Sequence, residues 1–403
     1  MKKIFKLLLY IALFIVVLSI GLYVTGYGYI LRAVQTTYLN GHKTAFIDDH
    51  PYFENAIIEN GEDIQEWPLA KDYNSIKATR SLDSLHKELE TAAFLIIQND
   101  SLVYENYYQE YGAASQTNSF SMAKSVVSLL MYKAIQDGYL ENIEQPVENF
   151  FPQFDKKLKI GDLSSMASGL NWDENYYNPF ASTARAYFGK DIREQVLDLK
   201  VIKNPGEKFE YLSGNTQLLA MVIEKATGKT LSNYLSESFW KPMGMNDNAL
   251  WQLDSKESAM EKAYCCIATN ARNFGKFGKL LLNNGQWNGE QLLDSAYIEQ
   301  LSKPRFENSP YYGYGFWLSD HNGKDIYYMR GILGQYVIII PEDELVIVRL
   351  GEKLIRKDDD KHYIPLTYSF LKVNKFQTED NWFLPGQVSK EGNFFTYYQS
   401  KIQ

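Results

Sequence analysis

Residues 120–130 read FSMAKSVVSLL, which places a serine three positions before a lysine at the start of an apolar run. The apolar residues have helical spacing, and side chains at i and i+3 share one face of a helix. The Ser121 hydroxyl and the Lys124 amine can therefore meet. The polar residues 117–119 are N-cap candidates, and a cap there would place Ser121 in the first helical turn.

This position suits acyl-transfer chemistry. The free N–H groups and the positive end of a helix favour an oxyanion near Ser121. A partly desolvated Lys124 beside that end has its charged form disfavoured, so a neutral amine is available to take the serine proton. The motif alone is not specific, because Ser-x-x-Lys occurs four times, with its serine at positions 84, 121, 238 and 369. The rest of the chain must decide between them.

Composition limits the function. The 403 residues carry a net charge of −8, and no Lys/Arg block is present, so we expect no nucleic-acid partner. The adjacent Cys265 and Cys266 cannot join distant segments, and we interpret them as packing residues. The histidines are scattered and no Gly-x-Ser-x-Gly motif occurs, which argues against a Ser-His-Asp enzyme. We expect no metal or organic cofactor and no obligate protein partner.

The N-terminus predicts a membrane segment. Residues 1–6 carry three lysines, and residues 7–31 carry no charge, a length sufficient to span a bilayer. Tyr23, Tyr27 and Tyr29 suit an aromatic belt, and the leading lysines favour an N-terminus inside the cell. We predict a single-pass anchor in a bacterial-type inner membrane with a periplasmic catalytic domain. The alternative is a cleaved signal peptide and a secreted protein.

The remaining chain divides into an irregular extension (32–80), a main domain (81–373) and a C-terminal tail (374–403). We predict a helix over 82–89 and a hairpin of 94–97 and 102–108 with a turn at 99–100. Helical patterns dominate from 121 to about 300. Strands are predicted at 314–318, 326–329, 335–340 and 344–350. This order indicates an α+β fold in which both ends of the domain form one antiparallel sheet around a helical insert.

Four further segments carry recognisable patterns. Residues 160–174 form a helix that runs into a Gly-containing turn, and 204–215 place Tyr211 between a Pro-Gly turn and a helix. Residues 268–278 open another helix, and 331–335 start a buried strand. Together they resemble the serine hydrolases that include class C β-lactamases, D-Ala-D-Ala carboxypeptidases and related esterases and amidases. The FEYLSGNT run at 209–216 resembles the Phe-x-Tyr-x-Ser-x-Asn-Thr element of the 6-aminohexanoate-dimer (nylon-oligomer) hydrolases.

The resemblance covers about residues 82 to 350 and implies a β-lactamase/transpeptidase-like fold. It also implies that Ser121 is the acylated nucleophile, Lys124 its base and Tyr211 the second proton-transfer group. The oxyanion hole would consist of the N–H groups of Ser121 and Ile332, and Gly331 would allow close approach of the backbone.

The resemblance suggests further substrate-binding residues, and it also shows a departure. We expect Ser213, Asn215, Gly331, Trp172 and Tyr177 to contribute to substrate binding. The family's Lys-Thr-Gly or His-x-Gly element aligns with Met329-Arg330-Gly331, so its first cation is missing. Arg330 is a possible substitute, although strand alternation could point it away.

The expected reaction is therefore hydrolysis of a small amide or ester through a Ser121 acyl-enzyme. Two alternatives stay open. One is a D-Ala-D-Ala carboxypeptidase or weak β-lactamase, against which the missing cation counts. The other is a non-catalytic penicillin-binding-like module, against which the combination of Ser121, Lys124 and Tyr211 counts.

Overall fold

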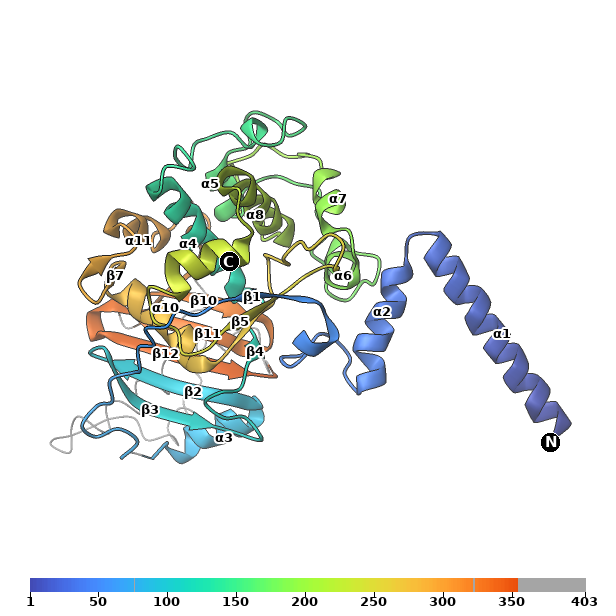
Figure 1. Ribbon diagram of the computed structural model, residues 1–403, viewed down its shortest axis with the longest axis horizontal. Coiled ribbons are helices and arrows are strands. Elements are labelled where there is room, and N and C mark those ends of the chain that lie inside the picture. The colour runs from blue at the N-terminus through green and yellow to red at the C-terminus, as the bar shows by residue number, and fades with distance from the viewer. Residues whose placement is uncertain (76, 322, 354–403) are drawn as a thin grey trace.

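A six-stranded antiparallel sheet forms the centre of the computed structural model, which describes residues 1–75, 77–321 and 323–353 (Figure 1). The strand order is β3-β2-β12-β11-β10-β9, so strands from both ends of the domain lie side by side. The prediction of one such sheet is confirmed. Its strands are β2 (Thr91–Gln98), β3 (Ser101–Tyr107), β9 (Trp317–His321), β10 (Lys324–Gly331), β11 (Gln335–Ile340) and β12 (Leu345–Gly351).

The sheet is buried on both faces. Along β2, Leu95 and Ile97 face one apolar core, whereas Phe94 and Ile96 face the other, as the pleat requires. The predicted hairpin turn is confirmed at residues 99–100, where Asn and Asp adopt positive φ angles. The predicted strand 314–318 begins later, at Trp317, because the chain bends at Gly315 with φ of +82°.

Helices cover both faces of this sheet (Figure 1). Helices α4 (Met122–Gln136) and α10 (Ala271–Leu282) contribute to the larger core, and α3 (Arg80–Glu88) packs Leu82 into the smaller one. The predicted helices near 82–89, 160 and 271 are therefore confirmed. The other helices of the domain are α5 (Ile160–Ser164), α6 (Ser182–Phe188), α7 (Ile192–Leu197), α8 (Ser213–Thr227), α9 (Leu231–Leu235) and α11 (Ser295–Leu301).

A second, four-stranded sheet leads the chain into α4. Its order is β1-β5-β6-β4, formed by β1 (Asn55–Ile58), β5 (Ala249–Gln252), β6 (Ile267–Thr269) and β4 (Thr117–Asn118). Strand β1 comes from the segment predicted to be irregular, and it is ordered because its backbone pairs with β5. A small hairpin joins β7 (Gln286–Trp287) to β8 (Glu290–Gln291). The predicted tail 374–403 lies outside the described residues.

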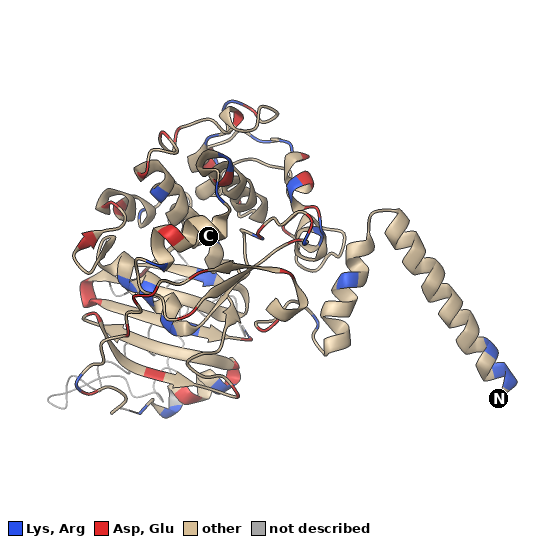
Figure 2. Ribbon diagram, in the orientation of Figure 1, with Lys and Arg blue, Asp and Glu red and all other residues tan. Residues whose placement is uncertain are grey.

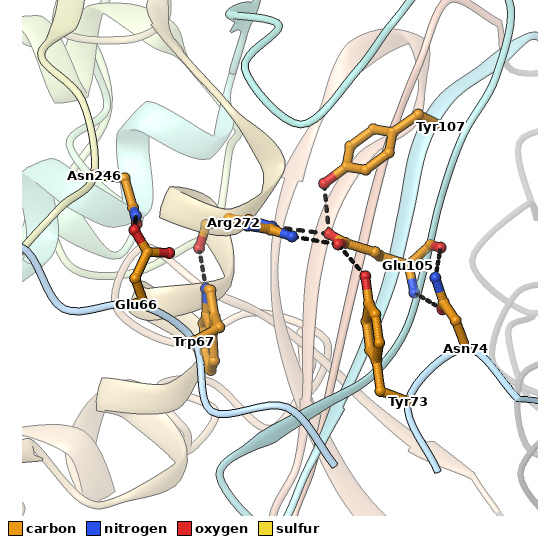
Figure 3. A network of polar contacts seen from close by, with 8 residues as sticks. All are labelled: Glu66, Trp67, Tyr73, Asn74, Glu105, Tyr107, Asn246 and Arg272. Atoms are coloured by element: carbon orange, nitrogen blue, oxygen red, sulfur yellow. Dashed lines mark hydrogen bonds and ion pairs between the residues drawn. The ribbon is translucent and has the colours of Figure 1, made fainter. Parts of the chain in front are cut away.

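A polar network fixes the N-terminal extension to the domain (Figure 3). The buried Glu105 of β3 accepts hydrogen bonds from Tyr73, from Tyr107 and from the Arg272 guanidinium of α10. The Trp67 indole donates to the Arg272 carbonyl at 3.1 Å. The extension is thus attached to the domain at several points.

The N-terminal apolar run forms two helices, not one. Helix α1 (Lys2–Val24) is long and apolar enough to cross a membrane, a property that signal sequences share. Its only charges lie at its N-terminal end (Figure 2). The chain then turns at Gly26, with φ of +82°, into α2 (Gly28–Thr36), where Tyr29 is buried against the domain. The segment 7–31 thus covers most of α1 and the first residues of α2, and its role as a membrane span stays a prediction.

Candidate active site

Ser121 lies at the junction between β4 and α4. It is the N-cap residue of α4, so the cap predicted at 117–119 lies too early in the sequence. The preceding Phe120 adopts φ of +43°, and its N–H donates to the Asn118 side chain at 2.8 Å. Asn118 in turn donates to the buried Asp49 at 3.0 Å. A bulky residue with positive φ is unfavourable, so these contacts hold a tight turn that presents Ser121.

Lys124 contacts Ser121 directly. Its Nζ donates to the Ser121 Oγ at 2.9 Å and to the Tyr264 carbonyl at 2.9 Å. The side chain is only 2% exposed. Burial lowers the pKa of Lys124 to about 8, against the opposing effect of the Glu174 charge. At pH 7, about a tenth of the molecules would then carry a neutral amine at this position.

Tyr211 completes the group. It precedes α8, and the Lys124 Nζ lies 5.0 Å from the centroid of its ring. Burial raises the pKa of Tyr211, although a hydrogen bond with Ser121 acts in the opposite direction. Tyr211 is therefore a neutral phenol near pH 7, suited to donate a proton rather than to remove one. The lowered pKa of Lys124 makes the lysine the better base.

Gly331 brings the end of β10 against the serine segment. A Cβ atom at Gly331 would lie 2.3 Å from the Ser119 carbonyl oxygen, so no larger residue fits this approach. Ile332 follows and opens a 3₁₀ turn, Ile332–Gly334, whose first N–H groups have no partner within the turn. Gly331 is the last residue of β10, and β11 begins at Gln335, as predicted for the strand 335–340.

Glu174 is a site residue that sequence reasoning did not assign. Its carboxylate accepts the Ser213 N–H at 2.6 Å and the Ser213 hydroxyl at 2.7 Å, at the N-terminus of α8. It also accepts the Tyr176 hydroxyl at 2.5 Å. Its charge raises the pKa of Lys124, so Glu174 acts on the candidate catalytic lysine. The only sequence signal is an acidic residue after the turn at Gly169.

The residues predicted to bind substrate occupy different environments. Asn215 is fully buried and accepts a hydrogen bond from Ser168, which favours a structural role. Trp172 is buried against Gly214 of α8, and its ring centroid lies 6.5 Å from that of Tyr264. Tyr177 is 98% exposed and makes little contact with the rest of the chain. Substrate binding by these residues stays a prediction.

Arg330 is close to the site rather than remote from it. Its guanidinium lies 5.2 Å from the centroid of the Trp317 ring, and that ring is 5.5 Å from the ring of Tyr211. The positive charge of Arg330 lowers the pKa of Tyr211, in opposition to burial. The concern that strand alternation would direct Arg330 away from the site is therefore not supported by this arrangement.

The adjacent cysteines do more than pack. Cys265 and Cys266 are both buried and are joined to each other by a disulfide bond. The Cys265 carbonyl accepts a hydrogen bond from the Trp251 indole at 3.0 Å. The preceding residue is Tyr264, whose carbonyl oxygen binds the Lys124 amine. The interpretation of Cys265 and Cys266 as packing residues is therefore incomplete, because it excludes bonds to distant segments but not a bond between the two neighbours.

The comparisons with known proteins agree with this arrangement. A family model described as Beta-lactamase matches residues 78–366. The chain belongs to the beta-lactamase family. Members of this family and its relatives are serine hydrolases of amide and ester bonds, and this chain is a serine hydrolase of that kind. The recognition made from the sequence motifs is confirmed.

Individual relatives are distant in sequence. The 6-aminohexanoate-dimer hydrolase of Paenarthrobacter ureafaciens is 23% identical over 304 residues, which cover 68% of this chain and 76% of the relative. A Bacillus anthracis structure, provisionally assigned as a 6-aminohexanoate-dimer hydrolase, has a TM-score of 0.71 at 22% identity and covers 86% of this chain and 95% of its own. An octameric penicillin-binding protein homologue from Pyrococcus abyssi has a TM-score of 0.56 at 19% identity, covering 73% and 76%. The fold is therefore β-lactamase/transpeptidase-like.

Proposed function

We propose that this protein hydrolyses a small amide or ester through an acyl-enzyme on Ser121, with Lys124 as base and Tyr211 as the second proton-transfer group. The observation that carries the proposal is the 2.9 Å contact between the Lys124 Nζ and the Ser121 Oγ. The lysine is buried and has a lowered pKa, which supports its role as a proton acceptor.

In the acylation step, neutral Lys124 accepts the Ser121 proton while Oγ attacks the substrate carbonyl carbon. The tetrahedral oxyanion accepts hydrogen bonds from the N–H groups of Ser121 and Ile332, each contributing about 3 kcal/mol. The leaving amine or alcohol then takes a proton from the Tyr211 phenol. Lys124 passes its proton to the resulting phenolate, which restores the phenol and the neutral amine. The ester of Ser121 remains.

Deacylation reverses these roles with water as the nucleophile. Lys124, again neutral after the leaving group departs with its proton, accepts a proton from water. The hydroxide attacks the acyl carbon, and Ser121 regains its hydrogen through the same pair of groups. Together the two steps consume one water molecule and release one carboxylic acid and one amine or alcohol.

We further propose that α1 stays attached as an anchor and that the catalytic domain is extracytoplasmic. The three lysines at the N-terminal end of α1 and the uncharged remainder of the helix support this orientation (Figure 2). Intact-mass measurement on the protein from its native membrane tests it. Loss of the first 24 or more residues would instead identify a cleaved signal peptide.

The reaction is tested by labelling and turnover on the full chain. A fluorophosphonate probe and a p-nitrophenyl ester are applied to the native protein, to Ser121→Ala and to Ser84→Ala. Ser84 lies exposed on α3 in another Ser-x-x-Lys pair and serves as the matched control. We expect labelling and turnover to be lost only in Ser121→Ala.

A penicillin applied in parallel separates the alternatives. A stable penicillin adduct on Ser121 would favour a D-Ala-D-Ala carboxypeptidase or weak β-lactamase. No reaction with any of the three reagents, in folded protein, would contradict enzymatic activity and favour a penicillin-binding-like module.

A further inference from the structure

The loop beside the active site carries an unusual set of exposed aromatic side chains. We refer to Tyr176, Tyr177 and Phe180 as the aromatic loop. Their side chains are 54%, 98% and 60% exposed, respectively. Several large aromatic side chains exposed on one short loop commonly mark a site of contact with a partner or a membrane. Both ends of this loop have defined neighbours.

One end of the loop lies against the segment that follows α1. The Phe180 ring packs edge-on against Tyr27, with ring centroids 5.3 Å apart. Helix α2 is fixed to the domain beside α6 (Figure 1), because Arg32 donates to the carbonyls of Gly189 and Asp254 at 3.3 and 3.0 Å. Only Thr25 and Gly26 separate Tyr27 from the end of α1, a reach of about 10 Å.

The other end of the loop lies at the catalytic group. The Tyr176 hydroxyl donates to Glu174, and Glu174 caps α8 through Ser213. Five residues separate Glu174 from Phe180 in the sequence, so the loop connects the site to the base of the anchor. A spanning helix of 23 residues is about 35 Å long, enough to cross the hydrocarbon core and reach the headgroup layer.

We propose that the aromatic loop lies in the headgroup layer of the bilayer that α1 spans and holds the entrance of the active site against that bilayer. Aromatic rings are favoured at this depth because they combine an apolar body with a polar edge. The chain continues from α1 directly to Tyr27, and the Tyr27 ring contacts Phe180, so we infer that the occupant is the membrane rather than a protein. The bilayer contact is independent of the reaction.

The location also indicates a class of substrate. An entrance at the headgroup layer favours an amphiphile whose amide or ester lies at the surface and whose acyl or amine chain lies in the bilayer. This second part of the inference rests on the proposed hydrolysis by Ser121. The two parts are therefore tested by different measurements.

The bilayer contact is tested by spin labelling of the full chain reconstituted in phosphatidylcholine vesicles. Tyr177→Cys, Phe180→Cys and the control Tyr139→Cys are labelled separately, since the two native cysteines are buried in a disulfide. We expect labels at 177 and 180 to collide with membrane-dissolved oxygen and to lose access to a water-soluble nickel chelate. The label at 139 keeps its access to nickel. Equal nickel access at all three positions would overturn the proposal.

The substrate class is tested with Phe180→Asp, in which a charge replaces an apolar contact with the bilayer. We expect turnover of a long-chain p-nitrophenyl ester embedded in the vesicles to fall about tenfold. Turnover of a soluble p-nitrophenyl acetate stays unchanged. Equal effects on both esters would overturn the amphiphile assignment. If neither ester is hydrolysed by the native chain, the proposed function fails, whereas the spin-label result still decides the bilayer contact.

Discussion

Lys124 is the residue on which the proposed chemistry of the site depends. Its amine lies 5.0 Å from the centroid of the Tyr211 ring and 5.6 Å from that of the Tyr264 ring. The residue is almost completely buried. Desolvation disfavours the ammonium form, which is why a group that normally titrates above 10 can act as a base near neutrality. The carbonyl of Tyr264 and the hydroxyl of Ser121 fix its position.

The first prediction concerns pH. Because the pKa of Lys124 is lowered to about 8, the reactive neutral form increases as pH rises, and kcat/KM should rise through pH 8 and then level off. Lys124→Arg keeps the positive charge but cannot be deprotonated, so we expect a loss of about a thousandfold at every pH. Lys133→Arg on the same helix is the control. A flat profile between pH 6 and 9 would contradict this role for Lys124.

The second prediction concerns Glu174. The negative charge of Glu174 raises the pKa of Lys124, so Glu174→Gln should lower that pKa and move the rising limb of kcat/KM to lower pH. Glutamine still accepts the Ser213 N–H and keeps the cap of α8. Glu174→Asp, which retains the charge, serves as the control. An unchanged midpoint in Glu174→Gln would show that the charge does not act on the base.

At the scale of elements, the site depends on the contact between β10 and the turn before α4. Gly331 permits this contact because it has no Cβ, and a Cβ at this position would overlap the Ser119 carbonyl oxygen. Ser125 adds a second link, since its hydroxyl donates to the Gly315 carbonyl at 2.6 Å. These contacts therefore hold the sheet and the helix that carry the two proposed oxyanion donors at a fixed separation.

The third prediction tests this separation. Gly331→Ala should push the end of β10 away from Ser119, displace the Ile332 N–H and lower kcat about a hundredfold, the effect of losing one oxyanion donor. Gly112→Ala is the matched control, because a Cβ there meets nothing within 4 Å and its φ is not positive. Native activity in Gly331→Ala would contradict the assignment of Ile332.

The fourth prediction concerns the network that ties the extension to α10 (Figure 3). Glu105→Gln removes the buried ionic partner of the half-buried Arg272 guanidinium, and we expect a loss of about 3 kcal/mol in the free energy of unfolding. Thermal or urea unfolding measures this loss. Glu299→Gln, from the exposed pair with Lys303, should cost less than about 1 kcal/mol. Similar losses in the two variants would contradict a structural role for the network.

At the scale of the whole molecule, the sequence predicted the parts of the fold that local patterns control. The late strands and the hairpin at 99–100 can be predicted because short apolar runs are separated there by turn residues. The pairing of Ser121 with Lys124 is visible because both lie within one helical turn. Strand β1 was missed because its four residues gain their order from β5, almost two hundred positions away.

Glu174 and the cysteine bond were missed for related reasons. Glu174 reaches the site only because α8 begins beside the turn that carries it, and no local pattern records that proximity. The bond between Cys265 and Cys266 depends on the backbone conformation, since Cys266 adopts φ of +76°. The predicted anchor (7–31) extends into α2 because residues 28–31 carry no charge, although Tyr29 is buried against the domain.

The bond between Cys265 and Cys266 gives this protein two chemically distinct forms. Disulfides persist in oxidising compartments and are reduced in the cytosol. A chain produced in a reducing host would emerge two hydrogen atoms heavier, with two thiols next to the Tyr264 carbonyl that binds the Lys124 amine. Specific activities of two preparations are therefore comparable only when their thiol content is the same. The choice of expression compartment thus becomes part of defining the enzyme.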